Sequence, residues 1–258
     1  MLSITPESII NLLQSLSPEF VSMLTLLCCY VAIYGFFRYW KDAGIYVYTS
    51  VCIIICNIHV LKAADFSWYN EPIAMGTIVY ATTFLASDLL TEFYGVEKAK
   101  KAVFLSFASS MMFIVLMILV LGYKPINTLN QQDSHFNEAH NAMLTLFTPS
   151  LAIIIASFTA YILSQLTDIY VFSKIRKLTK GGKLWLRTIL AVSLAALVDS
   201  VVFNLLAWRI FAPNPVSWHS LILTYTLGAY ILQMLVASLN VPAFYMIIKL
   251  LKNNKSTI

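Results

Sequence analysis

The sequence predicts an all-α integral membrane protein, built as a polytopic helical bundle of about seven transmembrane helices. Two observations lead to this prediction. Hydrophobic residues make up 59% of the 258-residue chain and charged residues only 11%, with a mean hydropathy of +0.77, whereas about a quarter of an ordinary soluble domain is charged. Apolar stretches of about 20 residues, long enough to cross a bilayer as a helix, recur with short polar segments between them. No room is left for a soluble domain of ordinary size.

The chain is expected to divide into an N-terminal amphipathic segment (1–18), a transmembrane domain (19–252) and a short cytoplasmic tail (253–258). In the first segment, apolar residues recur near helical spacing beside polar ones, which predicts a short helix lying in the membrane interface. This segment lacks the basic start and the small-residue cleavage site of a signal peptide. Its apolar positions are Ile4, Ile9, Leu12, Leu13 and Leu16.

Seven spans are expected, at about 20–37, 45–64, 72–94, 102–121, 143–172, 186–208 and 221–250. Residues 122–141 form the longest polar connection and are expected to be an aqueous loop. The fifth span is longer than one crossing requires, so it is expected to be tilted, bent near Pro149 or extended beyond the membrane. The four cysteines lie in apolar runs without metal-ligand spacing, so neither a disulfide framework nor a metal site is predicted.

Basic residues set the expected orientation, because cytoplasmic loops carry an excess of Lys and Arg. Fourteen of the 17 basic residues fall in alternate connections, on one side of the predicted bundle. We therefore expect the C-terminus in the cytoplasm and the N-terminus outside, in a multi-pass protein of the cell (inner) membrane. This asymmetry accounts for most of the net charge of +5 and gives no indication of nucleic-acid binding.

Acidic residues inside the predicted spans pose the functional question. Asp88 and Glu92 lie one helical turn apart on one face, and Asp168 lies at a similar depth in the fifth span. Asp199 is the deepest acid, about 18 Å past Arg187 by helical rise. Because a charge within the bilayer is costly, such groups usually face a cavity, a partner or a substrate.

Two of these acids also have a structural interpretation at the membrane interface. Glu92 could pair with Lys98 or with a neighbouring basic residue, and Asp168 could form a salt bridge with Lys174 or Arg176. In either case the acid would stabilise the fold without contacting a ligand.

Lys62 is the one basic residue well inside a predicted span. Its long stem could carry the ammonium group to the outer surface, or the ammonium could pair with Asp199 or with a ligand. We hypothesise that Lys62 and Asp199 neutralise each other without substrate, because each otherwise lacks an opposite charge at its depth.

Two segments resemble each other within the chain. FLASDLLTEFYG from Phe84 and YILSQLTDIYVF from Tyr161 align Ser87 with Ser164, and each is followed by basic residues and an apolar span. Both are expected to cross the membrane in the same direction. This pattern fits an internal parallel repeat with a site at the repeat interface, although chance similarity between apolar helices would also produce it.

Several motifs, in order, resemble the vitamin uptake transporter family, the queuosine precursor transporters. They are NIHVLK from Asn57, SDLLTEFYGVEKAKKAVFLSF from Ser87, SQLTDIYVFSKIRKL from Ser164 and GGKLWLRTILAVSLAALVDSVVFNLLAW from Gly181. The resemblance covers about 45–249, while the N-terminal span and the loop at 131–141 depart from the family pattern. It implies a carrier that imports a 7-deazaguanine, such as 7-cyano-7-deazaguanine, its aminomethyl analogue or queuine, for tRNA modification.

A deazaguanine presents adjacent N–H donors for a carboxylate, an oxo group for an amide or ammonium donor, and a flat face for an aromatic ring. The spans contain all three kinds of partner, Gln233, Asn240, Tyr80, Phe203 and Trp208 included. The residues we expect to bind substrate are Asn57, Lys62, Phe84, Asp88, Glu92, Tyr161, Gln165, Asp168, Asp199 and Asn204.

Other functional classes have weaker sequence support. The phosphate-binding GxxxxGK[ST] motif and the catalytic HExxH and GxSxG motifs are absent, so we expect neither an enzyme nor a cofactor. A seven-span receptor or sensor, or a carrier for another purine-like or vitamin-like molecule, stays open. Buried acids would allow proton coupling, facilitated diffusion fits equally well, and a homo-oligomer is compatible with the sequence.

Overall fold

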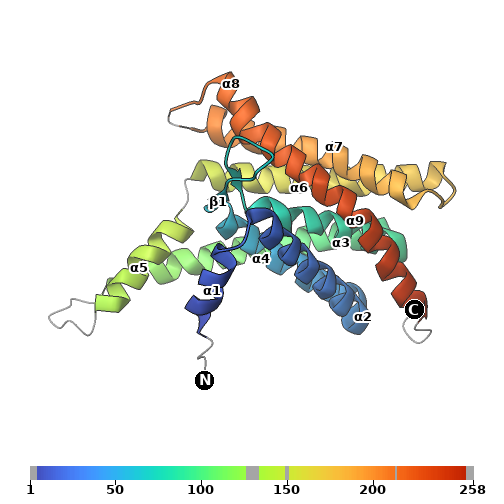
Figure 1. The fold of residues 1–258 in the computed structure, drawn as a ribbon, viewed down its shortest axis with the longest axis horizontal. Helices are drawn as coiled ribbons and strands as arrows, with labels where there is room; N and C mark the ends of the chain where they lie inside the picture. The colour runs from blue at the N-terminus through green and yellow to red at the C-terminus, as the bar shows by residue number, and fades with distance from the viewer. Residues whose placement is uncertain (1–4, 126–133, 149–150, 213, 254–258) are drawn as a thin grey trace.

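The computed structural model describes residues 5–125, 134–148, 151–212 and 214–253, and within them the chain is almost entirely helical (Figure 1). The elements are, in order, α1 (Pro6–Gln14), α2 (Pro18–His59), β1 (Ala63–Ala64), β2 (Ile73–Ala74), α3 (Gly76–Tyr94), α4 (Val96–Leu121), α5 (Ser134–Phe147), α6 (Leu151–Leu178), α7 (Leu184–Asn204), η2 (Leu205–Ile210), α8 (Trp218–Ser220), η3 (Leu221–Leu227) and α9 (Gly228–Asn253). The two strands form a minimal antiparallel hairpin. The all-α prediction is confirmed.

The segment labelled α2 consists of two helices that reverse direction at Lys41, where φ is 57° and ψ is −132°. The rings of Phe36 and Tyr48 lie 6.5 Å apart, although twelve residues of continuous helix would separate them by about 18 Å. Gly44 permits this close return, because a Cβ there would collide with the Phe36 carbonyl. The two halves correspond to the first two expected spans.

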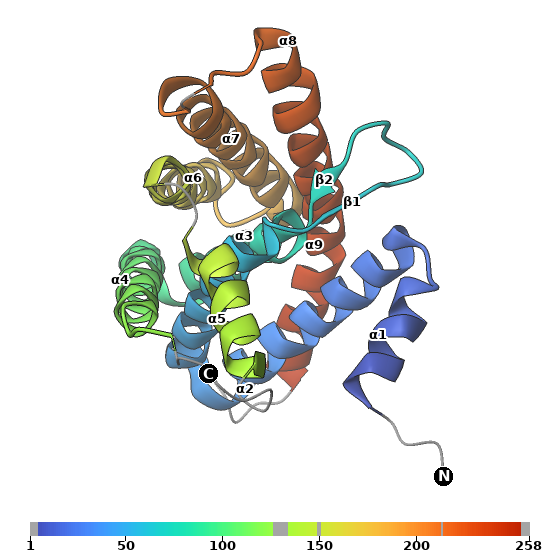
Figure 2. The same ribbon diagram turned by 90° about the vertical axis from the view of Figure 1, so that its left-hand side faces the viewer.

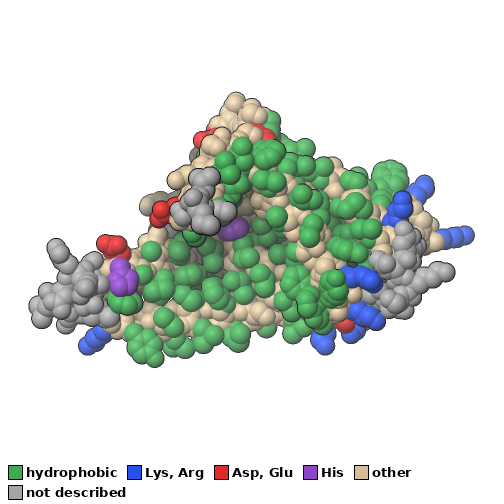
Figure 3. Space-filling view, turned by 60° about the horizontal axis from the view of Figure 1, so that its bottom comes forward, with side chains coloured by type: hydrophobic (Ala, Val, Ile, Leu, Met, Phe, Trp, Pro, Cys, Tyr) green, Lys and Arg blue, Asp and Glu red, His purple; other side chains and the backbone are tan. Residues whose placement is uncertain are grey.

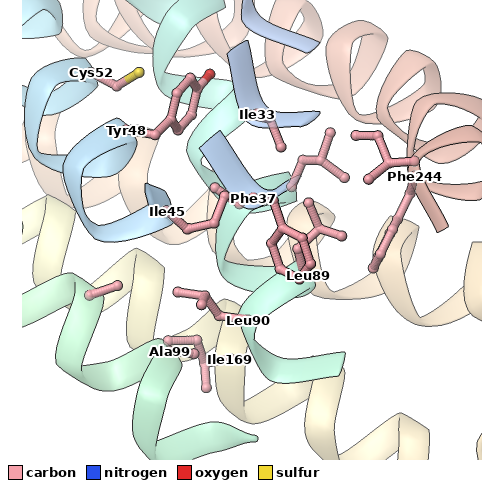
Figure 4. Close-up of a cluster of buried hydrophobic side chains, with 14 of the residues drawn as sticks. Ile33, Phe37, Ile45, Tyr48, Cys52, Leu89, Leu90, Ala99, Ile169 and Phe244 are labelled. Atoms are coloured by element: carbon pink, nitrogen blue, oxygen red, sulfur yellow. The ribbon is translucent and has the colours of Figure 1, made fainter. Parts of the chain in front are cut away.

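Helix α3 lies at the centre of the molecule, with α2 and α4 on one side and α6, α7 and α9 on the other (Figure 2). Every residue from Ala81 to Thr91 is buried, as expected of a helix that contacts neighbours all round. The largest buried apolar cluster joins α3 to both halves of α2 and to α9. Figure 4 shows Ile33, Phe37, Ile45, Leu89 and Phe244 meeting in it.

Helices α3 and α6 run in the same direction, as the sequence predicted for the two similar segments. Contacts between them advance together along both helices. Tyr80 bonds to Ser164, Thr83 to Gln165, Ser87 to Asp168, and Glu92 pairs with Arg176. The interface between these two helices is therefore lined with polar contacts over its whole length. The internal repeat itself stays a prediction.

Five of the described helices are long and apolar enough to cross a membrane, namely α2, α4, most of α6, α7 with η2, and α8 through α9. The span expected over 143–172 is divided between α5, which ends at Phe147, and α6, which begins at Leu151, on either side of the bend considered at Pro149. A proline at 149 lacks the backbone donor that would continue a helix, and this position lies outside the described residues. The expected aqueous loop also contains the start of α5.

Other boundaries differ from the sequence prediction in smaller ways. The second expected span stops at His59 instead of 64, and the chain then enters the hairpin, where the Lys62 carbonyl accepts a bond from the Met75 amide. The sixth and seventh spans contain the π-helical segments η2 and η3, which hydropathy does not reveal. Such segments are frequent at functional sites.

The face drawn in Figure 3 is mostly apolar, and most of its Lys and Arg side chains gather at one end. Ion pairs hold together the helix ends that meet there: Lys98 with Asp42, and Arg176 and Arg187 with Glu92. These contacts bring the α2 reversal, the ends of α3 and α6, and the starts of α4 and α7 together. The basic connections identified in the sequence therefore share one end of the bundle, which we call the basic end. The expected tail residues 254–258 and the first four residues lie outside the described part.

Candidate functional site

A cavity of about 390 Å³ lies between α3, α6, α7 and α9, near the end of the bundle opposite the basic end. Its walls include the second half of α2, the β hairpin, η2 and η3. Its volume falls within the usual range for small-molecule sites, and the lining is mostly apolar with a few polar groups, which is typical of such sites. Its polar lining includes Asn57, Tyr80, Ser157, Tyr161, Asp199, Asn204 and Gln233.

Asp199 provides the carboxylate of this cavity. Its Oδ1 accepts a hydrogen bond from the Tyr80 hydroxyl at 2.9 Å, and its Oδ2 accepts one from Gln233 Nε2 at 3.2 Å. The Tyr80 hydroxyl also lies 2.7 Å from Ser164 Oγ. Neutral donors therefore hold the carboxylate in place, and each oxygen has room for a further donor, because a carboxylate oxygen can accept more than one bond.

Two asparagines place amide groups at the same cavity. Asn57 Oδ1 accepts a hydrogen bond from Ser157 at 2.8 Å, which turns the amide nitrogen towards other acceptors. Asn204 Nδ2 donates to the Ser200 and Tyr225 carbonyls and to the Thr226 hydroxyl, so its side chain joins α7 to η3. The described residues thus supply a free amide donor at Asn57 and a free amide acceptor at Asn204.

Aromatic rings complete the lining. Tyr80 and Tyr161 meet edge to face with ring centroids 6.4 Å apart, and the Tyr161 hydroxyl lies 2.6 Å from Ser106 Oγ. On the other side, Trp208 and Tyr225 lie 5.2 Å apart in a tilted pair. A flat ligand would find ring faces and edges on both sides, which favours a planar heterocycle.

Four of the ten residues expected from the sequence line this cavity: Asn57, Tyr161, Asp199 and Asn204. Sequence analysis did not include Tyr80 and Gln233 in its final set, although both hold Asp199 in place. Ser157 was missed altogether, because an isolated serine in an apolar helix carries no distinctive pattern.

Three of the other expected residues lie outside the cavity and contact protein side chains or solvent. Phe84 is fully buried and packs against Val192, Ala195 and Ala237. Gln165 donates to Thr83 between α3 and α6. The Lys62 side chain is exposed. The hypothesised Lys62–Asp199 pair is wrong for this structure, because the chain leaves α2 after His59 and the Asp199 oxygens bond to Tyr80 and Gln233 instead.

The remaining three, Asp88, Glu92 and Asp168, belong to a separate buried acid cluster that lies nearer the basic end. Glu92 pairs with Arg187 at 2.8 Å and with Arg176 at 3.2 Å. The structural interpretation of Glu92, an ion pair with a basic residue near the membrane interface, thus agrees with the structure, and Lys98 pairs instead with Asp42.

Asp88 and Asp168 are the fully buried members of this cluster, and each is 0% exposed. Asp168 Oδ2 accepts a bond from Ser87 at 2.8 Å, and neither Lys174 nor Arg176 forms an ion pair with it in the described structure. Asp168 Oδ1 and both Asp88 oxygens have no hydrogen-bond partner among the described residues. Along α3, Asp88 lies about 12 Å from Tyr80, so this cluster is distinct from the cavity.

Comparison with known proteins gives a consistent result. A family described as "Putative vitamin uptake transporter" matches residues 74–247, from β2 into α9. A Bacillus subtilis (strain 168) protein named "Probable queuosine precursor transporter" is 26% identical over 227 residues, covering 88% of this chain and 93% of that protein. A Haemophilus influenzae protein with the same name is 28% identical over 156 residues, or 60% of this chain and 59% of that protein. No solved structure matches the chain.

Proposed function

This chain belongs to the vitamin uptake transporter family, and on this premise we propose that it is a membrane carrier that imports a queuosine precursor for tRNA modification. The substrate class is a 7-deazaguanine, such as 7-cyano-7-deazaguanine, its aminomethyl analogue or queuine. The names of the two relatives support this class. The structural observation that carries the proposal is a cavity within the bundle that combines a carboxylate, a free amide donor and aromatic rings.

The chemistry of the cavity fits the ring. The Asp199 carboxylate can accept from the adjacent N1–H and 2-amino groups of a deazaguanine, in the bidentate manner that carboxylates favour. The Asn57 amide nitrogen can donate to the 6-oxo group. Tyr161 and Trp208 offer ring faces or edges to the heterocycle. Guanine shares all these groups, so the substituent at position 7 must be read by other parts of the cavity.

The position of the cavity suggests an outward-open state. With the basic end in the cytoplasm, as the distribution of Lys and Arg favours, the cavity lies towards the outside. Below it, α3 and α6 are in tight contact, and Arg176 donates to the Thr91 and Glu92 carbonyls at the end of α3. Transport would then require α3 and α6 to separate at the basic end while the outer end closes.

Substitution of the cavity carboxylate tests the substrate class. Asp199→Asn should weaken binding of 7-cyano-7-deazaguanine to purified protein by about 10- to 100-fold, since a hydrogen bond to a charged group contributes about 1.5–3 kcal/mol. Titration calorimetry in detergent would measure this. Asp42→Asn is the matched control, because Asp42 pairs with Lys98 at the basic end, away from the cavity. Equal binding by wild type and Asp199→Asn would refute the assignment, and wild-type binding of adenine in preference to deazaguanines would indicate another substrate.

A carrier is favoured over a receptor because the polar groups converge on a cavity inside the bundle, and over an enzyme because the family is one of transporters. Uptake of labelled precursor into proteoliposomes separates these alternatives, since neither a receptor nor an enzyme would give net flux. We further propose that uptake is coupled to protons. The oligomeric state is a separate question, and light scattering of the purified protein would show whether it forms a homo-oligomer.

A further inference from the structure

The acid cluster between the cavity and the basic end contains buried polar groups that form no well-aligned hydrogen bond among the described residues, although the Thr188 hydroxyl lies near Asp88. Both Asp88 oxygens, Asp168 Oδ1 and the Thr188 hydroxyl make no hydrogen bond within the described residues, and all three side chains are 0% exposed. Buried polar atoms are normally hydrogen-bonded, so a group of unpaired ones within the membrane-spanning bundle requires a physical explanation.

The charges of this cluster do not balance. The charged groups that interact with Asp88 are Glu92 on α3 itself, Asp168 on α6 and Arg187 on α7. Arg176 belongs to the same cluster because it forms an ion pair with Glu92. Three carboxylates thus face two guanidinium groups, which leaves one negative charge in excess. Because an unpaired buried charge is costly, one added positive charge would make the cluster neutral.

We propose that Asp88 and Asp168 together bind a single proton, and that this proton is the coupling ion of the carrier. The inference rests on the proposed transport function and places the coupling site outside the substrate cavity. Two neighbouring carboxyl groups in a dry site cannot both ionise easily, so one proton is held by the pair.

The α3–α6 interface connects this proton site to the substrate. Ser87, next to Asp88, donates to Asp168. One turn further from the basic end Thr83 bonds to Gln165, and a turn beyond that Tyr80 bonds to both Ser164 and the cavity carboxylate Asp199. A movement of α3 against α6 would alter both sites at once. Two sites that bias the same movement are thermodynamically coupled.

Release of the proton would also affect the closure at the basic end. When the proton passes from the pair to cytoplasmic water, Asp88 becomes a carboxylate one helical turn from Glu92. It can then compete for Arg187, whose Nε makes no hydrogen bond in the described structure. The Arg187–Glu92 pair at 2.8 Å would then weaken, and Arg187 would be drawn one turn along α3 towards Asp88. Proton release inside would therefore rearrange the ion pairs that close the basic end.

Infrared spectroscopy tests the proton without any substrate. A protonated carboxyl group absorbs at a C=O frequency separate from that of a carboxylate, so wild-type protein at neutral pH should show this band. Asp88→Asn and Asp168→Asn should each lose one carboxyl equivalent of it, because the remaining acid of the pair then balances the arginines and ionises. Asp42→Asn should leave the band unchanged, since Asp42 is ion-paired. An identical band in wild type and both pair variants would overturn the proposal.

Transport measurements test the coupling. In proteoliposomes, an inward proton gradient should drive wild-type accumulation of labelled precursor above equilibrium. Asp88→Asn should abolish this accumulation, keep substrate exchange across the membrane, and bind precursor within about twofold of wild type. Accumulation that depends on Na⁺ and not on pH would overturn the proton assignment. Absence of any wild-type flux would refute the proposed function, whereas wild-type flux without a pH effect would refute only the coupling. If neither Asn variant assembles, the wild-type band and its pH response decide the matter.

Discussion

Removal of Arg187 should destabilise the fold far more than removal of an exposed cation at the same end. Arg187 is 1% exposed, pairs with Glu92 at 2.8 Å, and places its guanidinium 4.9 Å from the centre of the Phe172 ring. Breaking a buried pair costs about 3–5 kcal/mol. Glu92 keeps Arg176 at 3.2 Å and some contact with solvent, so we expect about 2–4 kcal/mol for Arg187→Gln.

The matched control is Lys98→Gln, which breaks an ion pair of similar length, 2.6 Å, whose side chains are 47% and 24% exposed. An exposed pair contributes about 0–1 kcal/mol. Equilibrium unfolding in mixed detergent micelles would give both values, and a double-mutant cycle with Glu92→Gln would isolate the pairwise energy. If Arg187→Gln costs no more than Lys98→Gln, the buried pair does not hold the α3–α7 contact, and the description of the inner closure fails.

Two further predictions concern the cavity and the α2 reversal. Tyr80→Phe removes the hydroxyl that donates to Asp199. The affinity for 7-cyano-7-deazaguanine, measured by calorimetry, should therefore fall about tenfold. Unchanged affinity would show that Tyr80 does not position the carboxylate. Gly44→Ala should lower the unfolding temperature, because the added Cβ would collide with the Phe36 carbonyl. Gly35→Ala, which has open space around it, is the control and should be neutral or slightly stabilising. Equal effects of the two substitutions in a thermal unfolding assay would contradict the close approach of the two halves of α2.

The sequence identified the buried acids of the cavity and of the acid cluster, but it did not identify the residues that contact them. Asp199 and Asp88 are both carboxylates within apolar segments, and the sequence assigns both to the same substrate site. In the structure Asp199 faces the cavity with two neutral donors, and Asp88 lies in a dry cluster without a hydrogen bond. The difference depends on the rotation of each helix about its axis. That rotation is set by packing against neighbours, which no single segment encodes.

Helix ends were a second source of error. Lys62 was expected inside a span because hydropathy stays high to about 64, and it lies instead in the turn that leads into the hairpin. The break between α5 and α6 was underestimated in the same way, since a window average does not register the end of a helix. The earlier end of the second span places the Lys62 side chain at the surface instead of in the interior.

The sequence by itself determined the class of protein, the apolar segments, the basic end and the parallel course of the two similar segments. These features depend on composition and on order along the chain, because each apolar segment enters the bilayer, and each basic loop stays in the cytoplasm, according to its own residues. Only the tertiary structure decided that α3 is the central helix, that Arg187 rather than Lys98 neutralises Glu92, and that substrate cavity and acid cluster are separate. Those outcomes depend on which helices touch and at what register, because the burial and the charge of a side chain are properties of its neighbours in space.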